Sequence, residues 1–334
     1  MLVPVTGFGG CDPNGYNSGL TPKMAFLFPG QGSQFAGMGK ALANTWPAAR
    51  RIFEEADDAL GFPLSRLSFE GPEDQLKLTE NTQPALLTVS MAAFAVLQEQ
   101  GLRPDYVAGH SLGEYSALVA AGSLRFADAL RLVRRRGRYM QEAVPAGVGA
   151  MAALLKLPEG KLEGVLEQAA QGEVVSAANL NSPDQTVIAG HAGAVARAMD
   201  LAKAAGARRA VLLPVSAPFH CALMKPAQER LRADLDATDF RDLSRPLVNN
   251  WQAREIRTGA EAREGLYQQV PNPVRWLESI RHLAGWGIGR FVEVGAGGVL
   301  TGLLRAIDAS LAGLKFGEPQ DLDTLGAAGW LARN

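Results

Sequence analysis

The alternation of short apolar runs with amphipathic helical segments between Phe26 and Ala143 is the feature that most constrains the fold. Apolar residues recur at helical spacing in the segments 38–60, 83–100, 112–121 and 127–143. Short apolar runs with the character of buried strands lie at 24–30 and 106–109. This alternation predicts an α/β fold in which helices cover a parallel sheet.

A second pattern begins near Pro145. Strands are expected at 149–157, 174–180, 185–191 and 208–215, and helices at 159–171 and 192–205. The order βαββαβ is that of a ferredoxin-like unit. The first pattern then resumes, with helices expected at 222–237, 276–286 and 300–309 and a strand at 290–295. We therefore predict a large α/β domain, formed by 24–145 and 215–320, into which a small ferredoxin-like domain at 146–214 is inserted.

Residues 1–23 are rich in Gly, Pro, Asn and Ser and show neither helical nor strand periodicity. This composition predicts a disordered N-terminal extension that is dispensable for folding, with Met24 as the natural first residue. A tag or a short ordered arm is the alternative interpretation.

The composition excludes several classes of protein. With 33 basic and 34 acidic residues the net charge is -1, which gives no electrostatic reason to expect a nucleic-acid or membrane partner. The two cysteines, Cys11 and Cys221, lie far apart, which favours a reducing compartment and argues against a zinc site. No apolar run reaches the roughly 18 residues of a membrane span, and residues 1–20 lack the pattern of a secretory signal. We expect a cytoplasmic monomer.

The sharpest local motif is Gly-His-Ser-Leu-Gly at 109–113, which follows a predicted strand and precedes a predicted helix. This G-x-S-x-G context is typical of a nucleophile elbow, a turn so tight that side chains on the flanking glycines would clash. The motif predicts that Ser111 is a nucleophile at a helix N-terminus, where free N–H groups favour developing negative charge. An ordinary serine N-cap is the alternative.

A serine nucleophile needs a base, and the chain offers four histidines, at positions 110, 191, 220 and 282. His110 points away from its neighbour on an elbow turn, the second histidine ends a strand of the small domain, and the fourth lies on a surface helix. His220 lies in the loop where the chain re-enters the large domain, and such loops commonly deliver catalytic groups. His220 is therefore the predicted base, with a buried structural histidine as the alternative.

Two further segments are candidates for the site. The loop FPGQGSQ at 28–34 lacks the pattern of a nucleotide site, but its backbone N–H groups can form half of an oxyanion hole with the N–H of Leu112. A tight turn is the alternative for this loop. One predicted helix carries five arginines, and Arg136 lies closest to the apolar face of that helix. There its planar guanidinium group would suit a carboxylate or a phosphate. The alternative is an ordinary surface charge.

Six motifs together resemble a known family. They are FPGQGSQFAGMG, GHSLGEYSALVAAG, RGRYMQEAVPAGVGAMAA, NLNSPDQTVIAGH, LPVSAPFHCALMKPA and FVEVGAGGVLTGL. In order and spacing they are similar to those of malonyl-CoA:acyl carrier protein transacylases of fatty-acid synthesis, over residues 24–307. The resemblance implies an α/β-hydrolase-like large domain with an inserted ferredoxin-like subdomain. It also implies malonyl-CoA and holo-acyl carrier protein as partners, with no metal and no redox cofactor.

The resemblance assigns a role to individual positions. Ser111 would carry the acyl group, His220 would be the general base and Arg136 would bind the malonyl carboxylate. The backbone N–H of Gln31 would join that of Leu112 in the oxyanion hole.

Gln269 would orient the histidine through its backbone carbonyl, so that no acidic triad member is expected. Phe219 fits malonyl-using members better than methylmalonyl-using relatives. Two departures from the family pattern are GAGGVL in place of GPGKVL, and Pro271 after the glutamine.

The implied reaction is a two-step transfer of the malonyl group from CoA to the carrier's thiol through a malonyl-serine. Two rival functions remain open. One is a serine esterase or thioesterase that uses the same elbow, and the other is a non-catalytic protein that binds the carrier. A trans-acting acyltransferase of polyketide synthesis is a further variant of the same chemistry.

Overall fold

The computed structural model describes residues 23–215 and 217–331. The predicted N-terminal extension lies outside these residues, with one exception. Lys23, which was assigned to the extension, begins strand β1 (Lys23–Phe28) and pairs with Ile288. The strand starts there because backbone pairing, which does not depend on side-chain polarity, extends one residue beyond the apolar run.

The first sheet has six strands in the order β10-β9-β1-β2-β7-β8. The other five strands are β2 (Tyr106–Gly109), β7 (Leu247–Val248), β8 (Glu255–Ile256), β9 (Ile288–Val294) and β10 (Ala312–Phe316). Neighbouring strands run parallel except β7 and β8, which are antiparallel. The prediction of an α/β fold with a parallel sheet is confirmed.

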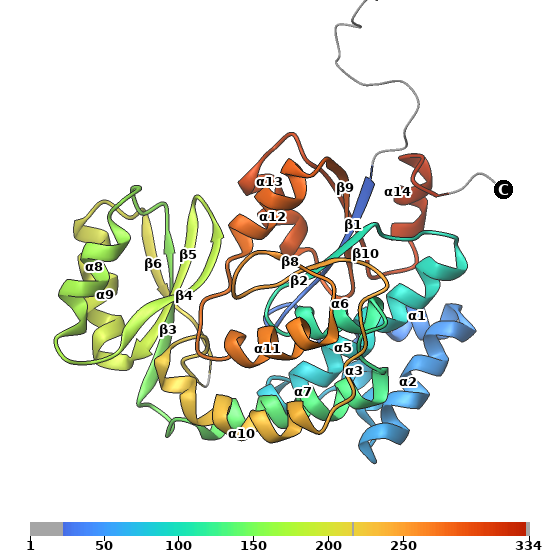
Figure 1. The fold of residues 1–334 in the computed structure, drawn as a ribbon, viewed down its shortest axis with the longest axis horizontal. Helices are drawn as coiled ribbons and strands as arrows, with labels where there is room; N and C mark the ends of the chain where they lie inside the picture. Colours follow the sequence, from blue (N-terminus) through green and yellow to red (C-terminus); the bar gives the residue numbers. More distant parts are fainter. Residues whose placement is uncertain (1–22, 216, 332–334) are drawn as a thin grey trace, which may run out of the picture.

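Strand β1 shows why helices cover both faces of this sheet. Its side chains alternate, so that Phe26 and Phe28 belong to one buried cluster and Ala25 and Leu27 to another. The first cluster includes helices α1 (Lys40–Thr45), α2 (Pro47–Leu60), α5 (Thr79–Glu99), α6 (Gly113–Ala120), α7 (Phe126–Glu142) and α10 (Lys225–Asp236). The second includes α12 (Trp276–Gly285) and α13 (Val299–Ile307). Figure 1 shows β1 in the middle of the large domain, between these groups.

The helix predicted at 38–60 is wrong in one respect, because it is two helices. The chain is extended at Trp46, and Pro47 is the first residue of α2. Proline disfavours helical conformation in the residue before it and lacks an N–H, so α1 ends and α2 begins at this point. The sequence did not predict α3 (Leu64–Glu70), α4 (Glu73–Leu76), α11 (Gly259–Gln269), α14 (Asp321–Ala327), β7, β8 or β10.

The second sheet has the strand order β4-β5-β3-β6, and all its neighbouring strands are antiparallel. Its elements are β3 (Gly149–Leu155), α8 (Leu162–Ala170), β4 (Val175–Ser182), β5 (Gln185–His191), α9 (Ala192–Ala204) and β6 (Arg209–Leu212). Helices α8 and α9 pack on one face of it, at the left of Figure 1. Chain order and sheet order together are those of a ferredoxin-like unit, as predicted. We retain 146–214 as the proposed bounds of the small domain.

Strand β4 joins the two parts of the molecule. The backbone N–H of Leu180 donates to the carbonyl of Val274, and the N–H of Val274 donates to the carbonyl of Ala178, both at 2.9 Å. Val274 lies two residues before α12 in the large domain, so backbone hydrogen bonds fix the inserted sheet to the large domain.

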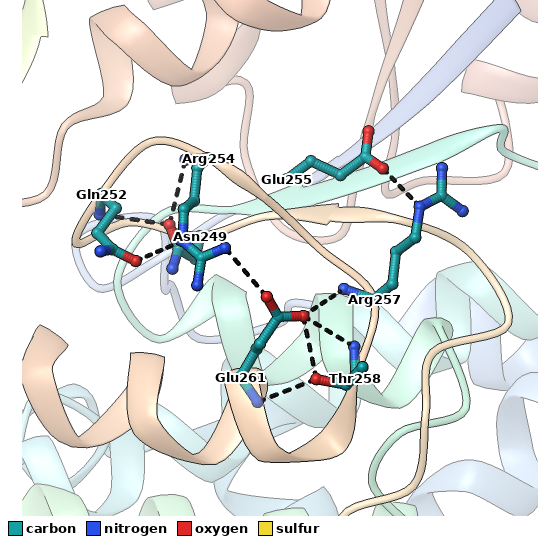
Figure 2. A network of polar contacts seen from close by, with 7 residues as sticks. All are labelled: Asn249, Gln252, Arg254, Glu255, Arg257, Thr258 and Glu261. Atoms are coloured by element: carbon teal, nitrogen blue, oxygen red, sulfur yellow. Dashed lines mark hydrogen bonds and ion pairs between the residues drawn. The ribbon is translucent and has the colours of Figure 1, made fainter.

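Helix α11 begins with a side-chain cap at Thr258. Figure 2 shows the Thr258 hydroxyl accepting from the N–H of Glu261 while the Glu261 carboxylate accepts from the N–H of Thr258. This capping box satisfies donors that a helix start leaves free. A hydrogen bond from the backbone of Arg257 is the largest of the influences that lower the pKa of Glu261 to about 2. The last residue of the helix anchored in this way is Gln269.

No helix in the described part of the chain is long and apolar enough to span a membrane.

Candidate active site

Ser111 occupies a strained turn between β2 and α6. Its φ angle is 52°, in the left-handed region that few residues other than glycine adopt. A Cβ on Gly109 would lie 1.9 Å from the backbone of Gly113, and a Cβ on Gly113 would lie 2.0 Å from the carbonyl oxygen of Phe28. The two glycines are therefore required by backbone packing, as the elbow motif predicts.

His220 is the histidine that meets this serine. Its Nε2 lies 2.7 Å from the Oγ of Ser111, and its Nδ1 lies 2.9 Å from the backbone carbonyl of Gln269. Because a carbonyl oxygen can only accept, Nδ1 carries the proton and Nε2 is free to accept the proton of the serine. Nδ1 thus donates its hydrogen bond to an amide carbonyl and not to a carboxylate.

The surroundings of His220 keep its imidazole neutral. Burial is the larger cause and the positive charge of Arg136 the next, and together they lower the pKa of His220 to about 3. A neutral imidazole is the form that acts as a general base.

The other three histidines have different partners. The Nε2 of His110 lies 2.8 Å from the Oδ1 of Asn181 on β4. His191 accepts from the backbone of the small domain, and His282 binds a backbone carbonyl of the large domain.

Arg136 is buried, although it lies on a helix whose other arginines are more exposed. Its side chain is 1% accessible. One terminal nitrogen, Nη1, donates to Gln83 Oε1 at 2.9 Å, and the other, Nη2, donates to Gln269 Oε1 at 2.8 Å and to Ser111 Oγ at 3.2 Å. Burial lowers the pKa of Arg136, and in the described chain no carboxylate forms an ion pair with it. The site therefore places a cation beside the serine without a direct counter-ion.

The loop after β1 packs directly against the elbow. The N–H of His110 donates to the carbonyl of Phe28 at 3.0 Å, and a Cβ on Gly30 would lie 2.3 Å from the carbonyl of His110. Gln31 follows in this loop, and its side chain donates to the hydroxyl of Thr79 at 3.4 Å. The structure thus brings the Gln31 loop beside Leu112, the residue after the serine.

Comparison with known proteins identifies the family. A profile described as an acyl transferase domain matches residues 25–313. The chain is 50% identical over 302 residues to a protein of Bacillus subtilis strain 168 named malonyl CoA-acyl carrier protein transacylase, covering 90% of this chain and 95% of that protein. The chain belongs to the malonyl CoA-acyl carrier protein transacylase family. It is therefore an acyltransferase, as the sequence motifs indicated.

Other members agree in sequence and in structure. The transacylase of Escherichia coli K12 is 49% identical over 298 residues, covering 89% of this chain and 96% of that protein. The solved transacylase of Coxiella burnetii is 43% identical with a TM-score of 0.91, and the match covers 95% of this chain and all of the other. A type II PKS acyl-carrier protein in complex with its malonyl-transacylase is matched with 46% identity, a TM-score of 0.88 and coverage of 90% and 98%.

Sequence reasoning missed Asn250, which holds both sides of the transacylase elbow. Its Oδ1 accepts from the N–H of Ser111 at 2.7 Å, and its Nδ2 donates to the carbonyl of Gly109 at 2.6 Å. Asn250 follows β7, the neighbour of β2, at the carboxyl end of the sheet, where ligands bind in open α/β sheets. A position after a strand could have indicated Asn250 as a site residue, but β7 has only two residues and is too short to locate from sequence.

Sequence reasoning also missed Glu114, although it lies within the motif GHSLGEYSALVAAG. Its Oε2 accepts from Gln269 Nε2 at 2.8 Å and from the backbone N–H of Asn250 at 3.0 Å. The Gln269 amide nitrogen also donates to the carbonyl of Ser111 at 3.0 Å. Gln269 thus meets the serine, the histidine and the arginine at once.

The structure shows the contacts made around the two departures from the family pattern. The backbone carbonyl of Gln269, two residues before Pro271, still accepts a hydrogen bond from His220. Proline at position 271 is therefore compatible with this hydrogen bond. In the GAGGVL segment, the Glu293 carboxylate accepts from the N–H groups of Leu300 and Thr301, at 3.0 and 2.7 Å. The N-terminus of α13 is therefore occupied by a side chain of β9.

Across residues 23–215 and 217–331, no group of three or more His, Cys, Asp and Glu side chains is arranged to hold a metal ion.

Proposed function

We propose that this enzyme transfers a malonyl group from malonyl-CoA to the phosphopantetheine thiol of acyl carrier protein, in support of fatty-acid elongation. One observation carries the proposal: the Oγ of Ser111 lies between the Nε2 of His220, at 2.7 Å, and the Nη2 of Arg136, at 3.2 Å. A base and a buried cation meet at one hydroxyl, which suits attack on a thioester whose acyl group ends in a carboxylate.

In the first step His220 takes the proton of Ser111 while the hydroxyl oxygen attacks the thioester carbonyl. The backbone N–H groups of Gln31 and Leu112 donate to the oxyanion that forms. The carbon–sulfur bond then breaks, and the CoA thiolate leaves with the proton held by His220. The products are malonyl-Ser111 and free CoA thiol, and no net proton is gained or lost.

In the second step the carrier's thiol replaces CoA. His220 takes the thiol proton, the sulfur attacks the serine ester, and the proton returns to the Oγ of Ser111 as the ester bond breaks. Both half-reactions use the same groups, so ping-pong kinetics are expected.

Arg136 supplies selectivity for the acyl group. A guanidinium matches a carboxylate with two parallel hydrogen bonds, and burial strengthens the attraction between the charges. The small residue often seen before the histidine in methylmalonyl-using relatives is Phe219 here, which supports malonyl as the preferred group.

The remaining partners and properties are proposals of the same kind. Holo-acyl carrier protein as the acceptor is supported by the solved relative that holds a carrier protein. That relative's carrier belongs to a type II PKS, which makes polyketide-type transfer the second candidate. Reaction without a cofactor, a cytoplasmic location and a monomeric state complete the proposal. Rates with fatty-acid and polyketide carrier proteins would separate the two pathways.

The decisive experiment is intact-mass measurement after mixing with malonyl-CoA. We expect wild-type protein to gain one malonyl group and the Ser111→Ala variant to gain none. Ser116→Ala is the matched control, because Ser116 is a buried serine in helix α6, which begins just after Ser111. A malonyl adduct that persists in Ser111→Ala would refute the assignment. Rapid release of free malonate without a carrier would favour the esterase alternative.

A further inference from the structure

Glu114 is a buried carboxyl group that the proposed transfer does not use. It lies in the first turn of α6 with 0% of its side chain exposed. Its Oε2 accepts two hydrogen bonds, from Gln269 and Asn250, whereas its Oε1 has no partner among the described residues. A buried carboxyl oxygen without a donor is a position at which a proton can be held.

The amide of Gln269 connects this carboxyl group to Arg136. Its nitrogen donates to Glu114 and its oxygen accepts from Arg136, both at 2.8 Å. A carboxylate can only accept and a guanidinium can only donate, so the two neighbours fix the orientation of the amide. Glu114 is thus the counter-charge of Arg136, one amide away.

The other titratable groups of the network are neutral. Burial lowers the pKa values of His220 and His110 and raises that of Tyr115. Helix α5 and the loop after strand β7 contribute the amides of Gln83 and Asn250, which carry no charge. Above pH 7, before substrate binds, the network therefore holds one positive charge, on Arg136, and one negative charge, on Glu114.

Binding of a malonyl group, which is the substrate of the proposed function, changes this balance. Its carboxylate adds a second negative charge to a buried cluster with a single cation. Keeping two carboxylates ionised in one buried site costs free energy, because like charges repel and burial removes their solvation. One of the two carboxylates therefore takes a proton. The malonyl carboxylate contacts the guanidinium directly, whereas Glu114 lies behind an amide. Glu114 is therefore the group that is protonated.

We propose that Glu114 takes up one proton from solvent, on Oε1, when the malonyl carboxylate binds Arg136. Above pH 7 the network then holds one positive and one negative charge both before and after binding. Burial, the largest influence, raises the pKa of Glu114 to about 7, so this carboxyl group is close to its protonation midpoint at neutral pH before substrate arrives. It follows that malonyl-CoA binds more weakly as the pH rises above 7, because the proton that Glu114 must take up is present at lower concentration.

The test is calorimetry of malonyl-CoA binding at pH 8 in two buffers of different ionisation enthalpy, with Ser111→Ala to prevent transfer. We expect an uptake of about one proton per malonyl-CoA bound, since one new charge must be balanced. Acetyl-CoA, which adds no charge, should cause none. Adding Glu114→Gln should abolish the uptake and flatten the pH dependence of malonyl-CoA affinity. Adding Glu293→Gln, at another buried carboxyl whose pKa is raised by burial, should change neither result.

A second measurement needs no variant at Glu114. Acylation of the wild-type enzyme at pH 8, in weakly buffered solution with a pH indicator, should consume about one proton per malonyl-serine formed, because the chemical step itself is proton-neutral. Malonylation of Ser111 without proton uptake would overturn the inference and leave the proposed function intact. Uptake that survives Glu114→Gln would also overturn it. A protein that does not bind malonyl-CoA would overturn both.

Discussion

Two buried residues with different charges meet at the hydroxyl of Ser111. His220 must stay neutral to accept a proton, and Arg136 must stay charged to hold a carboxylate. Their proximity favours the neutral imidazole, because the charge of Arg136 adds to burial in lowering the pKa of His220. Predictions at this scale concern the protonation of the base and the selectivity of the cation.

The first prediction concerns the pH dependence of acylation. The pKa of His220 is lowered from 6.5 to about 3, so His220 should remain a competent base at pH 5 to 6. We expect the rate of acyl-serine formation to be nearly constant from pH 8 to 5 in Glu114→Gln, which lacks the other group that titrates in the network. Quenched-flow mass measurement gives this rate. A tenfold fall per pH unit below 6.5 would contradict the prediction.

The second prediction concerns Arg136→Ala, which should invert selectivity. Removing one partner of a buried ion pair costs roughly 3–5 kcal/mol, so malonyl transfer should fall by about 10²–10³ or more. Acetyl-CoA has no carboxylate to lose and should be affected much less. The readout is the ratio of acyl-serine formation with the two substrates.

The control for Arg136→Ala is Arg138→Ala, an exposed position on the same helix. It should leave the ratio of the two rates unchanged. An equal loss for both substrates in Arg136→Ala would mean that the guanidinium supports the fold or binds CoA.

At the scale of elements, the turn from β2 to α6 places the nucleophile and the capped helix α11 delivers Gln269. The turn depends on close approach of backbone segments, and the start of α11 depends on side-chain hydrogen bonds to free N–H groups. The glycines of the elbow and the capping box of Thr258 and Glu261 are therefore the sequence features that fix the site's geometry.

The third prediction compares two helical glycines. Gly113→Ala brings a Cβ to 2.0 Å from the carbonyl oxygen of Phe28, so it should lower the free energy of unfolding by about 1–3 kcal/mol or more and displace Ser111. Gly164→Ala in α8 meets nothing within 4 Å and should raise stability by up to about 1 kcal/mol. Urea unfolding and malonylation rates measure the two effects. Equal stability of both variants would show that the elbow tolerates a side chain.

At the scale of the whole molecule, the inserted sheet contacts the catalytic turn. The hydrogen bond from His110 to Asn181 joins the elbow to β4, and the backbone pairing at Val274 lies on the same strand. The small domain therefore helps to hold the turn that presents the serine.

The fourth prediction is that His110 and Asn181 are energetically coupled. Asn181→Ala leaves a buried ring nitrogen without its partner, which should cost about 1–3 kcal/mol of unfolding free energy. In a double-mutant cycle with His110→Ala, the combined loss should be smaller than the sum of the single losses. Gln185→Ala on the neighbouring strand β5 is the control and should show no coupling. Additive losses at His110 and Asn181 would mean that the contact contributes nothing.

The sequence alone determined the features that depend on neighbours along the chain. Strand and helix periodicity predicted the inserted sheet and strands β1, β2 and β9 of the first sheet, and the glycines around Ser111 predicted the elbow, because each pattern is a local steric or hydrophobic requirement. Short elements with little periodicity, such as β7 and β8, were not predictable in this way.

The tertiary structure decided what the buried polar groups contact. Helical spacing placed Arg136 near an apolar line but left its burial open, and no local pattern indicated that Glu114 and Asn250 would meet Gln269. These contacts join residues from separate elements, 155 positions apart for Glu114 and Gln269. Burial makes each unpaired donor or acceptor costly, so the partners are set by which polar groups the packed core encloses together. That choice is made only when the sheet, α7 and α11 have packed, and for this reason the charge balance of the site became visible only in the folded molecule.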